Sequence, residues 1–250
     1  MGDAVASPTQ PDAPALSFGQ RLIGVFISPG ETFEDVARKP DFWAPLITVV
    51  IASVAVIETM LWKIGAERIA RINIEQSARA GNMSPEQMDQ AVSQAAKFTA
   101  IAYHVAGVLG PPIGLLVIAG VGILIVNVIF GARVGFKTVF SVVCYADLVT
   151  LIGAIMSIAL MFFGDPDRFN PQNPIPSNIA FFLNPRQVSK PLYSLASSVD
   201  IFTIWLLILL GIGLSKASGG KVKSTSISLA FTGIWLLWVL AKVGLSMIGS

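Results

Sequence analysis

The sequence predicts an all-α integral membrane protein, a polytopic helical bundle of five transmembrane helices with interfacial amphipathic helices. Of its 250 residues, 54% are hydrophobic and only 13% are charged, well below the roughly 25% charged residues of an ordinary soluble domain. Five apolar stretches are long enough to cross a hydrocarbon core, which takes about 20 helical residues. These stretches lie near residues 43–63, 98–130, 136–163, 199–216 and 226–248.

The counts of charged, cysteine and histidine residues exclude several classes of function. The 17 Lys and Arg residues nearly balance the 15 Asp and Glu residues, which is too even a charge for a nucleic-acid partner. The single cysteine, Cys144, and the single histidine, His104, exclude an internal disulfide and every zinc motif that needs paired ligands. The signatures of hydrolases, P-loop proteins and dinucleotide-binding enzymes are absent. The sequence therefore predicts no enzyme activity, no catalytic residue, no cofactor and no metal.

The chain before the first span divides into a tail and a pair of short helices. Residues 1–16 are rich in Ala, Pro and Asp and contain no Lys or Arg, which predicts a disordered cytoplasmic tail. Residues 17–42 predict interfacial amphipathic helices, and Arg21 lies off the apolar face of the first. That face consists of Phe18, Leu22, Val25 and Phe26.

A second helix is expected to start at the sequence Ser-Pro-Gly-Glu. Ser28 suits the N-cap and Pro29 the first helical position, and Glu31 is expected to bond back to the cap. Pro40 should end this helix before the first span.

Residues 43–250 form the predicted five-span membrane domain. Between its first two spans, residues 64–97 predict two amphipathic helices. The proline-rich segment 164–198 predicts a surface loop with one short helix. The stretch 98–130 is too long for one straight span, and we expect it to kink or break at the Gly-Pro-Pro sequence of residues 110–112.

The distribution of basic residues predicts the orientation in the membrane. Short loops that carry Lys and Arg without acidic neighbours are expected on the cytoplasmic side. Those residues are Arg133 and Lys137 after the second span, and Lys216, Lys221 and Lys223 after the fourth. The N-terminus is then cytoplasmic, and after five crossings the C-terminus is outside.

Glu58, His104, Asp147 and Lys242 lie away from the ends of the predicted spans, where an ionisable side chain costs about 2.5–3.5 kcal/mol on insertion scales and needs a partner. Glu58 lies 13 residues beyond Pro45 and Lys242 lies 13 beyond Leu229, which places both about 20 Å from the inner edge of the membrane. His104 falls in the same layer and Asp147 near the midplane. This candidate polar cluster has two interpretations. Glu58 and Lys242 form a structural ion pair beside a neutral His104, or Glu58, His104 and Asp147 line a path for protons or cations.

Several short motifs resemble one known family. They comprise Ser28, Pro29, Gly30, Glu31, Thr32 and Phe33, followed by Pro40, Trp43, Pro45 and Leu46, then Tyr145, Ala146, Asp147 and Leu148, and lastly Asp200, Ile201, Phe202, Trp205 and residues 211–215. Together they resemble prokaryotic members of the Yip family of Ypt/Rab-GTPase-interacting membrane proteins, over most of residues 18–240. The resemblance implies a five-span helical fold with a cytoplasmic N-terminus in a prokaryotic cytoplasmic (inner) membrane. It also implies kinship with a group linked to vesicle traffic in eukaryotes.

The favoured function is that of a membrane scaffold or adaptor, which organises the membrane or docks protein partners. Its expected partners are membrane lipids and either another protein or a second copy of the chain, as a homo-oligomer. The alternative is a small ion, proton or solute transporter or channel. A transporter needs polar residues across both leaflets, whereas little lies below Asp147 except Asn127.

Overall fold

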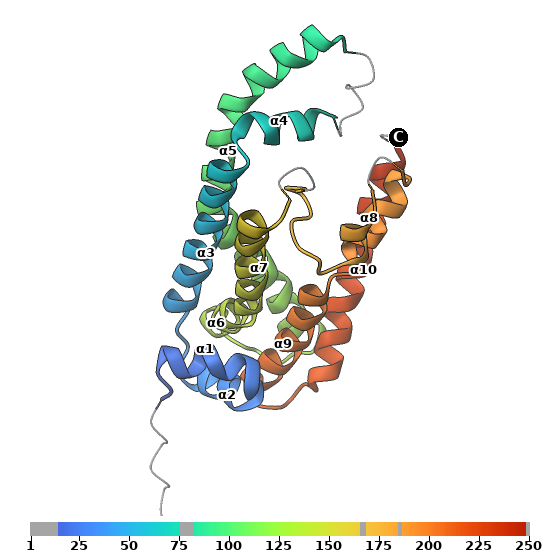
Figure 1. Ribbon diagram of the computed structural model, residues 1–250. Coiled ribbons are helices and arrows are strands. Elements are labelled where there is room, and N and C mark those ends of the chain that lie inside the picture. Colours follow the sequence, from blue (N-terminus) through green and yellow to red (C-terminus); the bar gives the residue numbers. More distant parts are fainter. Residues whose placement is uncertain (1–14, 76–82, 166–168, 185–186, 249–250) are drawn as a thin grey trace, which may run out of the picture.

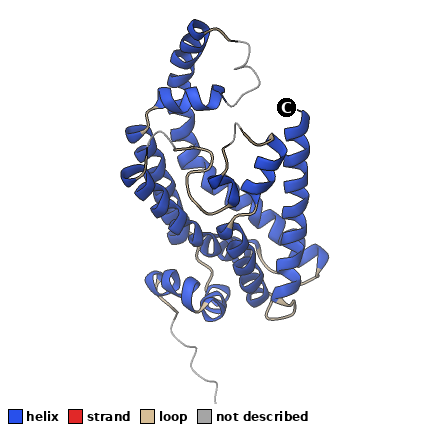
Figure 2. Ribbon diagram, turned by 45° about the vertical axis from the view of Figure 1, so that its right-hand side comes forward, coloured by secondary structure: helices blue, strands red, loops and turns tan. Residues whose placement is uncertain are grey.

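The computed structural model describes residues 15–75, 83–165, 169–184 and 187–248, and these residues are largely helical (Figures 1 and 2). Most of the predicted disordered tail, residues 1–14, lies outside the described part of the chain. The helices in chain order are α1 (Phe18–Ile27), α2 (Pro29–Arg38), α3 (Trp43–Lys63), α4 (Ala66–Glu75), α5 (Pro85–Ile123), η2 (Leu124–Ile129), α6 (Phe136–Ala146), η3 (Asp147–Val149), α7 (Thr150–Phe163), η5 (Ile179–Phe182), α8 (Lys190–Ser198), α9 (Ile201–Ala217) and α10 (Ser224–Ile248).

The predicted all-α membrane fold is confirmed. Four helical stretches of the described chain are long and apolar enough to cross a membrane: Trp43–Lys63, Pro85–Ile129, Phe136–Phe163 and Ser224–Met247. The remaining expected span, 199–216, corresponds to α9, which is apolar but has 17 residues. At 1.5 Å per residue this helix is about 26 Å long, slightly less than a typical hydrocarbon core of about 30 Å. The count of five spans therefore stays a prediction.

Of the kink or break expected at residues 110–112, the break does not occur: α5 continues through both prolines to Ile123. A broken helix in lipid would expose backbone groups that no water can satisfy, and this favours a continuous helix. The irregular turn comes later, where η2 is a π-helix that contains Asn127. The Asn127 side chain accepts a hydrogen bond from Val134 N at 2.7 Å and donates one to Val134 O at 2.9 Å. This pair fixes the loop that follows.

The connecting segments agree in part with the prediction. Residues 64–97 contain α4 and the start of α5, and the second of these helices runs directly into the second span. Ser84 caps α5 by accepting from Gln87 N, while its own N–H donates to Gln87 Oε1. Residues 164–198 contain both the 3₁₀ turn η5 and the helix α8, one helical element more than expected.

The helices pack so that the two N-terminal helices close one end of the bundle. In Figure 1, α1 and α2 lie across its lower end, where α2 packs against α9 and α6. Above them, α3 packs against α5 and α7, while α10 packs against α9 and α8. One hydrophobic core runs from the N-terminal helices into the spans, and it includes Val25, Phe33, Val36, Val142, Tyr145, Leu148 and Leu214. The N-terminal helices are therefore part of the folded bundle.

Candidate functional site: a locked N-terminal platform

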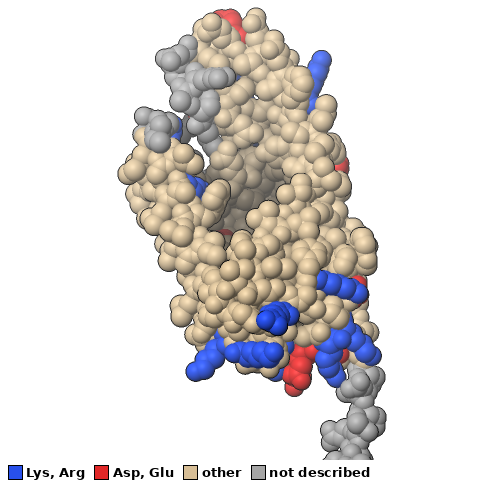
Figure 3. All heavy atoms as spheres, turned by 180° about the vertical axis from the view of Figure 1, so that it is seen from behind, with Lys and Arg blue, Asp and Glu red and all other residues tan. Residues whose placement is uncertain are grey.

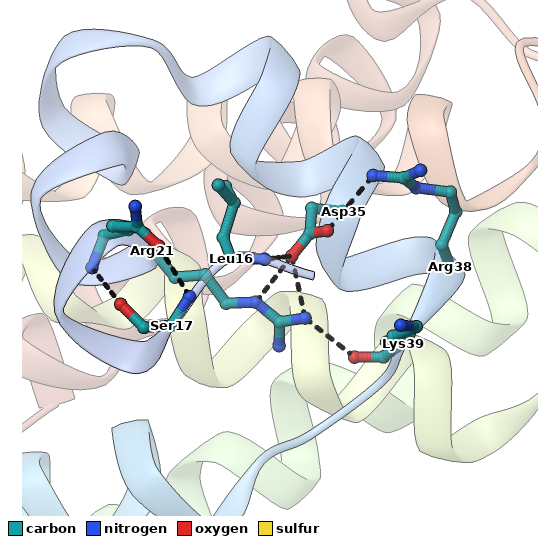
Figure 4. A network of polar contacts seen from close by, with 7 residues as sticks. Leu16, Ser17, Arg21, Asp35, Arg38 and Lys39 are labelled. Atoms are coloured by element: carbon teal, nitrogen blue, oxygen red, sulfur yellow. Dashed lines mark hydrogen bonds and ion pairs between the residues drawn. The ribbon is translucent and has the colours of Figure 1, made fainter. Parts of the chain in front are cut away.

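A buried ion pair joins α1 to α2. The Arg21 side chain reaches Asp35 across the turn between the helices, with both Nε and Nη2 of Arg21 2.8 Å from Asp35 Oδ2 (Figure 4). The two side chains are only 5% and 3% exposed. A buried charge is tolerated when it is paired and hydrogen-bonded, so this pair fixes the relative position of the two helices.

Further bonds complete the network around this carboxylate. Asp35 Oδ2 accepts from Leu16 N at 3.2 Å, and Asp35 Oδ1 accepts from Arg38 Nη2 at 3.1 Å. Arg21 Nη2 also donates to Lys39 O at 3.1 Å, just beyond the end of α2. The network therefore ties the entry to α1 and the exit from α2 to one point (Figure 4). We call the unit of α1 and α2 the platform.

Tyr145 of α6 connects this network to the membrane domain. The guanidinium carbon of Arg21 lies 5.6 Å from the centroid of the Tyr145 ring, within cation–π range. Phe18 of α1 contacts the same ring, with centroids 6.4 Å apart. Burial lowers the pKa of Arg21, but its contacts with Tyr145 and Asp35 outweigh that effect, so the pKa is raised and the guanidinium stays charged. The Tyr145 hydroxyl is buried and has no hydrogen-bond partner among the described residues.

Phe33 of α2 anchors the platform to α9 and α6. Its side chain is fully buried at Gly213 of α9 and Val142 of α6. A Cβ added to Gly213 would lie 2.9 Å from Phe33 Cδ1 and closer still to Val142 Cγ1. Glycine at this position therefore permits the close approach of the three helices.

The structure places the other family-like residues around the same platform. α2 begins at Pro29 as expected, but the Ser28 side chain makes no capping hydrogen bond, which corrects the prediction. Instead the Ser28 carbonyl accepts from both the backbone N–H and the hydroxyl of Thr32. Glu31 is exposed in the first turn of α2, and Pro45 is buried in the first turn of α3.

Sequence reasoning missed the Arg21–Asp35 pair because it placed Arg21 off the apolar face of α1. In the structure Arg21 is only 4% exposed. The spacing of Arg21 could have indicated its burial, since it lies three residues after Phe18 and four before Val25 on one side of the helix. The pattern gives no indication, however, that Asp35 would lie opposite.

A surface ion pair adds a second link between the platform and α9. Lys216 Nζ lies 2.7 Å from Glu34 Oε2, and this hydrogen bond lowers the pKa of the Glu34 carboxyl. Because both side chains are exposed, we assign little stability to this pair.

Glu58 and His104 of the predicted polar cluster do come together. His104 Nε2 lies 3.0 Å from Glu58 Oε1, which joins α5 to α3. The other ring nitrogen, Nδ1, lies 2.6 Å from Ala100 O. Both side chains are about half exposed, so the pair lies on the outer surface of the bundle.

The expected ion pair between Glu58 and Lys242 is not formed. Lys242 Nζ instead donates to the hydroxyls of Ser197 and Ser198, each at 3.2 Å, and to Ser194 O at 3.5 Å. These acceptors lie in the last turns of α8, where the helix dipole favours a cation. Two residues at equal depth in their spans can contact each other only if their helices are neighbours. Here α10 packs against α8 and α9.

Asp147 stands apart from both of these pairs. It begins the short 3₁₀ segment η3 between α6 and α7. The Thr150 hydroxyl donates to the Asp147 carbonyl at 2.7 Å and lies 3.4 Å from its carboxylate. Among the described residues, no group of three or more His, Cys, Asp or Glu side chains is placed to hold a metal ion.

These placements predict which intramembrane residues are energetically coupled. Glu58→Gln and His104→Gln should couple in a double-mutant cycle, because each removes one side of the same 3.0 Å contact. Glu58→Gln and Lys242→Met should be additive within about 0.5 kcal/mol, since the two residues share no partner. Unfolding by sodium dodecyl sulfate from a mild detergent, followed by circular dichroism, provides the free energies. Coupling of Glu58 to Lys242 beyond that limit would contradict the assignment.

Comparison with known proteins identifies the family. The Yip1 domain matches residues 23–243, from the middle of α1 to near the end of α10. This chain belongs to the Yip1 family. The chain is also similar to the membrane protein YknW of Bacillus subtilis (strain 168), with 26% identity over 208 residues, covering 83% of this chain and 82% of YknW. No solved structure gives a significant match to this chain.

Proposed function

We propose that this protein is a non-enzymatic membrane scaffold or adaptor whose platform docks a protein partner or organises the surrounding membrane. The observation that carries the proposal is the buried Arg21–Asp35 pair, which together with Phe33 fixes α1 and α2 to the ends of α6 and α9. A surface held in this way is preorganised for binding, because its ordering does not have to occur when the partner arrives. Ile23 and Ile27 of α1 remain 57% and 76% exposed on it.

The arrangement of polar residues gives less support to the alternative of a small transporter or channel. Glu58 and His104 lie on one side of the bundle, Lys242 lies against α8, and Asp147 lies in η3 with Thr150 as its partner. Among the described residues, Asp147 makes no hydrogen bond or ion pair with Glu58, His104 or Lys242, which favours the scaffold. The hollow visible in Figure 3 is bordered almost wholly by uncharged residues in that view.

We extend the proposal to five spans, a cytoplasmic N-terminus and an external C-terminus in a prokaryotic inner membrane. Support comes from the exposed basic residues, which gather at the end of the bundle that carries the platform (Figure 3). The positive-inside rule places such an end on the cytoplasmic side. α9 serves as the fourth span in this arrangement, because its position between α6 and α10 aligns it with helices that are long enough to cross.

Cysteine accessibility tests this orientation. Single cysteines at Gly219 and Gln172 should be labelled from opposite sides, with Gly219 reached only from the cytoplasm and Gln172 only from outside. The native Cys144 is fully buried and contributes little background. The reverse pattern of labelling would overturn the proposed orientation.

Docking on the platform is tested by affinity purification in a mild detergent, with identification of the proteins that are retained. We compare the natural chain with Ile23→Gln/Ile27→Gln on the platform and with Ile179→Gln in η5, which is 62% exposed. A stoichiometric partner that the platform variant loses and the control keeps supports the adaptor. A tightly held ion or solute and no such partner would favour the transporter.

A further inference from the structure

One end of the bundle carries a ring of exposed basic side chains. Near the ends of the spans that adjoin the platform, the described residues include seven of them: Arg38, Lys39, Arg133, Lys137, Lys216, Lys221 and Lys223. Three exposed acidic residues share this region: Glu31, Glu34 and Asp41. In Figure 3, blue atoms of Lys and Arg gather at the lower end of the molecule, with some red atoms of Asp and Glu among them. We call this region the basic end.

Five of these side chains have no carboxylate partner within the described chain, and Lys39 is one of them. Lys216 pairs with Glu34 and Arg38 with Asp35. The other four lie in or directly beside the two interhelical loops: Arg133, Lys137, Lys221 and Lys223. Their charge is therefore free to bind an anion.

The first of these loops is held in place by a residue of the second span. Both bonds from the Asn127 side chain go to the backbone of Val134, which is itself buried. Arg133 directly precedes Val134 and has a positive φ of 58°, which is uncommon for a residue other than glycine. The loop therefore presents Arg133 from a fixed backbone.

The second loop is built in the same way. Ser215 Oγ donates to Val222 O at 2.7 Å, and Val222 N donates to Ser218 Oγ at 3.3 Å. Val222 is buried in the same core cluster as Val134. Lys221 and Lys223 lie on either side of Val222, and both are exposed. Their side chains therefore extend from a backbone that is held in place, as that of Arg133 does.

We infer that these two pinned loops bind the phosphate headgroup of an anionic membrane lipid. Lysine and arginine recognise phosphate by charge and hydrogen bonding, and unpaired basic residues beside span ends lie at the depth of lipid headgroups. Lys223 immediately precedes α10, and Lys137 is the second residue of α6. A lipid whose chains lie along these helices would have its phosphate at the level of the loops. The inference is independent of the side that the basic end faces and of any protein bound to the platform.

Lipid selectivity measured on the full-length protein tests this inference. The protein in a neutral detergent receives equal amounts of phosphatidylglycerol and phosphatidylcholine with identical acyl chains, and native mass spectrometry counts the lipids retained. We expect at least a tenfold preference for phosphatidylglycerol, which Lys221→Gln/Lys223→Gln should reduce by about tenfold. Lys221→Arg/Lys223→Arg should keep the preference, because the charge is retained.

Matched variants and a soluble competitor distinguish lipid binding at these loops from a general attraction of anionic lipids to any basic residue of the protein. Lys63→Gln/Lys97→Gln removes the same charge at the other end of α3 and from the N-terminal part of α5, and it should leave the preference unchanged. Arg133→Gln in the first loop should lower it and serves as the second variant if the lysine pair fails to fold. Three results would overturn the inference. The first is equal retention of the two lipids, and the second is a loss of preference in the Lys63/Lys97 control as large as in the Lys221/Lys223 variant. The third is full displacement of the lipid by about 10 mM inorganic phosphate, a concentration on the order of the Kd of a weak site.

Discussion

Asp35→Ala should destabilise the protein by about 3–5 kcal/mol, because it leaves the buried Arg21 guanidinium without its carboxylate. The same change removes the hydrogen-bond acceptor of Leu16 N and of Arg38 Nη2. The bonds that join α1, α2 and the segment before α1 are therefore lost together. Unfolding by sodium dodecyl sulfate from mild detergent gives the free energy. Hydrogen exchange of α1 and α2 should increase more than that of α3.

Glu31→Ala is the matched control for this experiment. It removes a carboxylate from the same helix, but Glu31 is exposed, so its effect should stay within about 0.5 kcal/mol. Replacing both partners, as Arg21→Met with Asp35→Leu, should recover much of the stability because no unpaired charge remains. If Asp35→Ala unfolds at the same point as Glu31→Ala, the buried pair does not hold the platform.

Phe33→Ala should also cost about 3–5 kcal/mol, the usual range for a buried phenylalanine whose site cannot collapse. The cavity would lie between Gly213 and Val142, and neither residue can fill it: glycine has no side chain, and Val142 sits on a helix fixed by its own span. The change should therefore release α2 from α9 while the spans remain folded.

Phe98→Ala is the control for Phe33→Ala. It removes a phenylalanine side chain that does not lie between α2 and α9. Phe98 is 74% exposed on α5, so its truncation should have little effect on the free energy of unfolding. Limited tryptic proteolysis after Arg38 provides a second measurement, since cleavage there should accelerate only in the Phe33 variant. Equal cleavage in both variants would show that Phe33 does not anchor α2.

The predictable part of this fold is the part that depends on local composition. The first and third spans were expected at 43–63 and 136–163, and the structure has helical stretches with those bounds. The two N-terminal helices and the paired helices of residues 64–97 were also expected. Apolar length and proline or capping residues decide these features, and both are readable along a single segment.

The prediction was wrong where segments that are distant in sequence decide the outcome. Two consecutive prolines locally favour a break, yet α5 continues because the surrounding bundle and the absence of water in lipid favour an intact helix. The prediction of an ion pair between Glu58 and Lys242 was wrong for a related reason. Residue spacing gives depth along a span, but it leaves open the rotation of the helix and the identity of its neighbours.

The sequence by itself determined the membrane class, the helical content and the concentration of basic residues in the loops at one end of the bundle. It also identified Phe33 and Tyr145 within family-like motifs. Only the tertiary structure decided that Arg21 meets Asp35, that Phe33 rests on Gly213, and that Lys242 binds α8. Each of these contacts joins two helices, and a contact between helices depends on their packing order and rotation, which the periodicity of either helix alone does not specify.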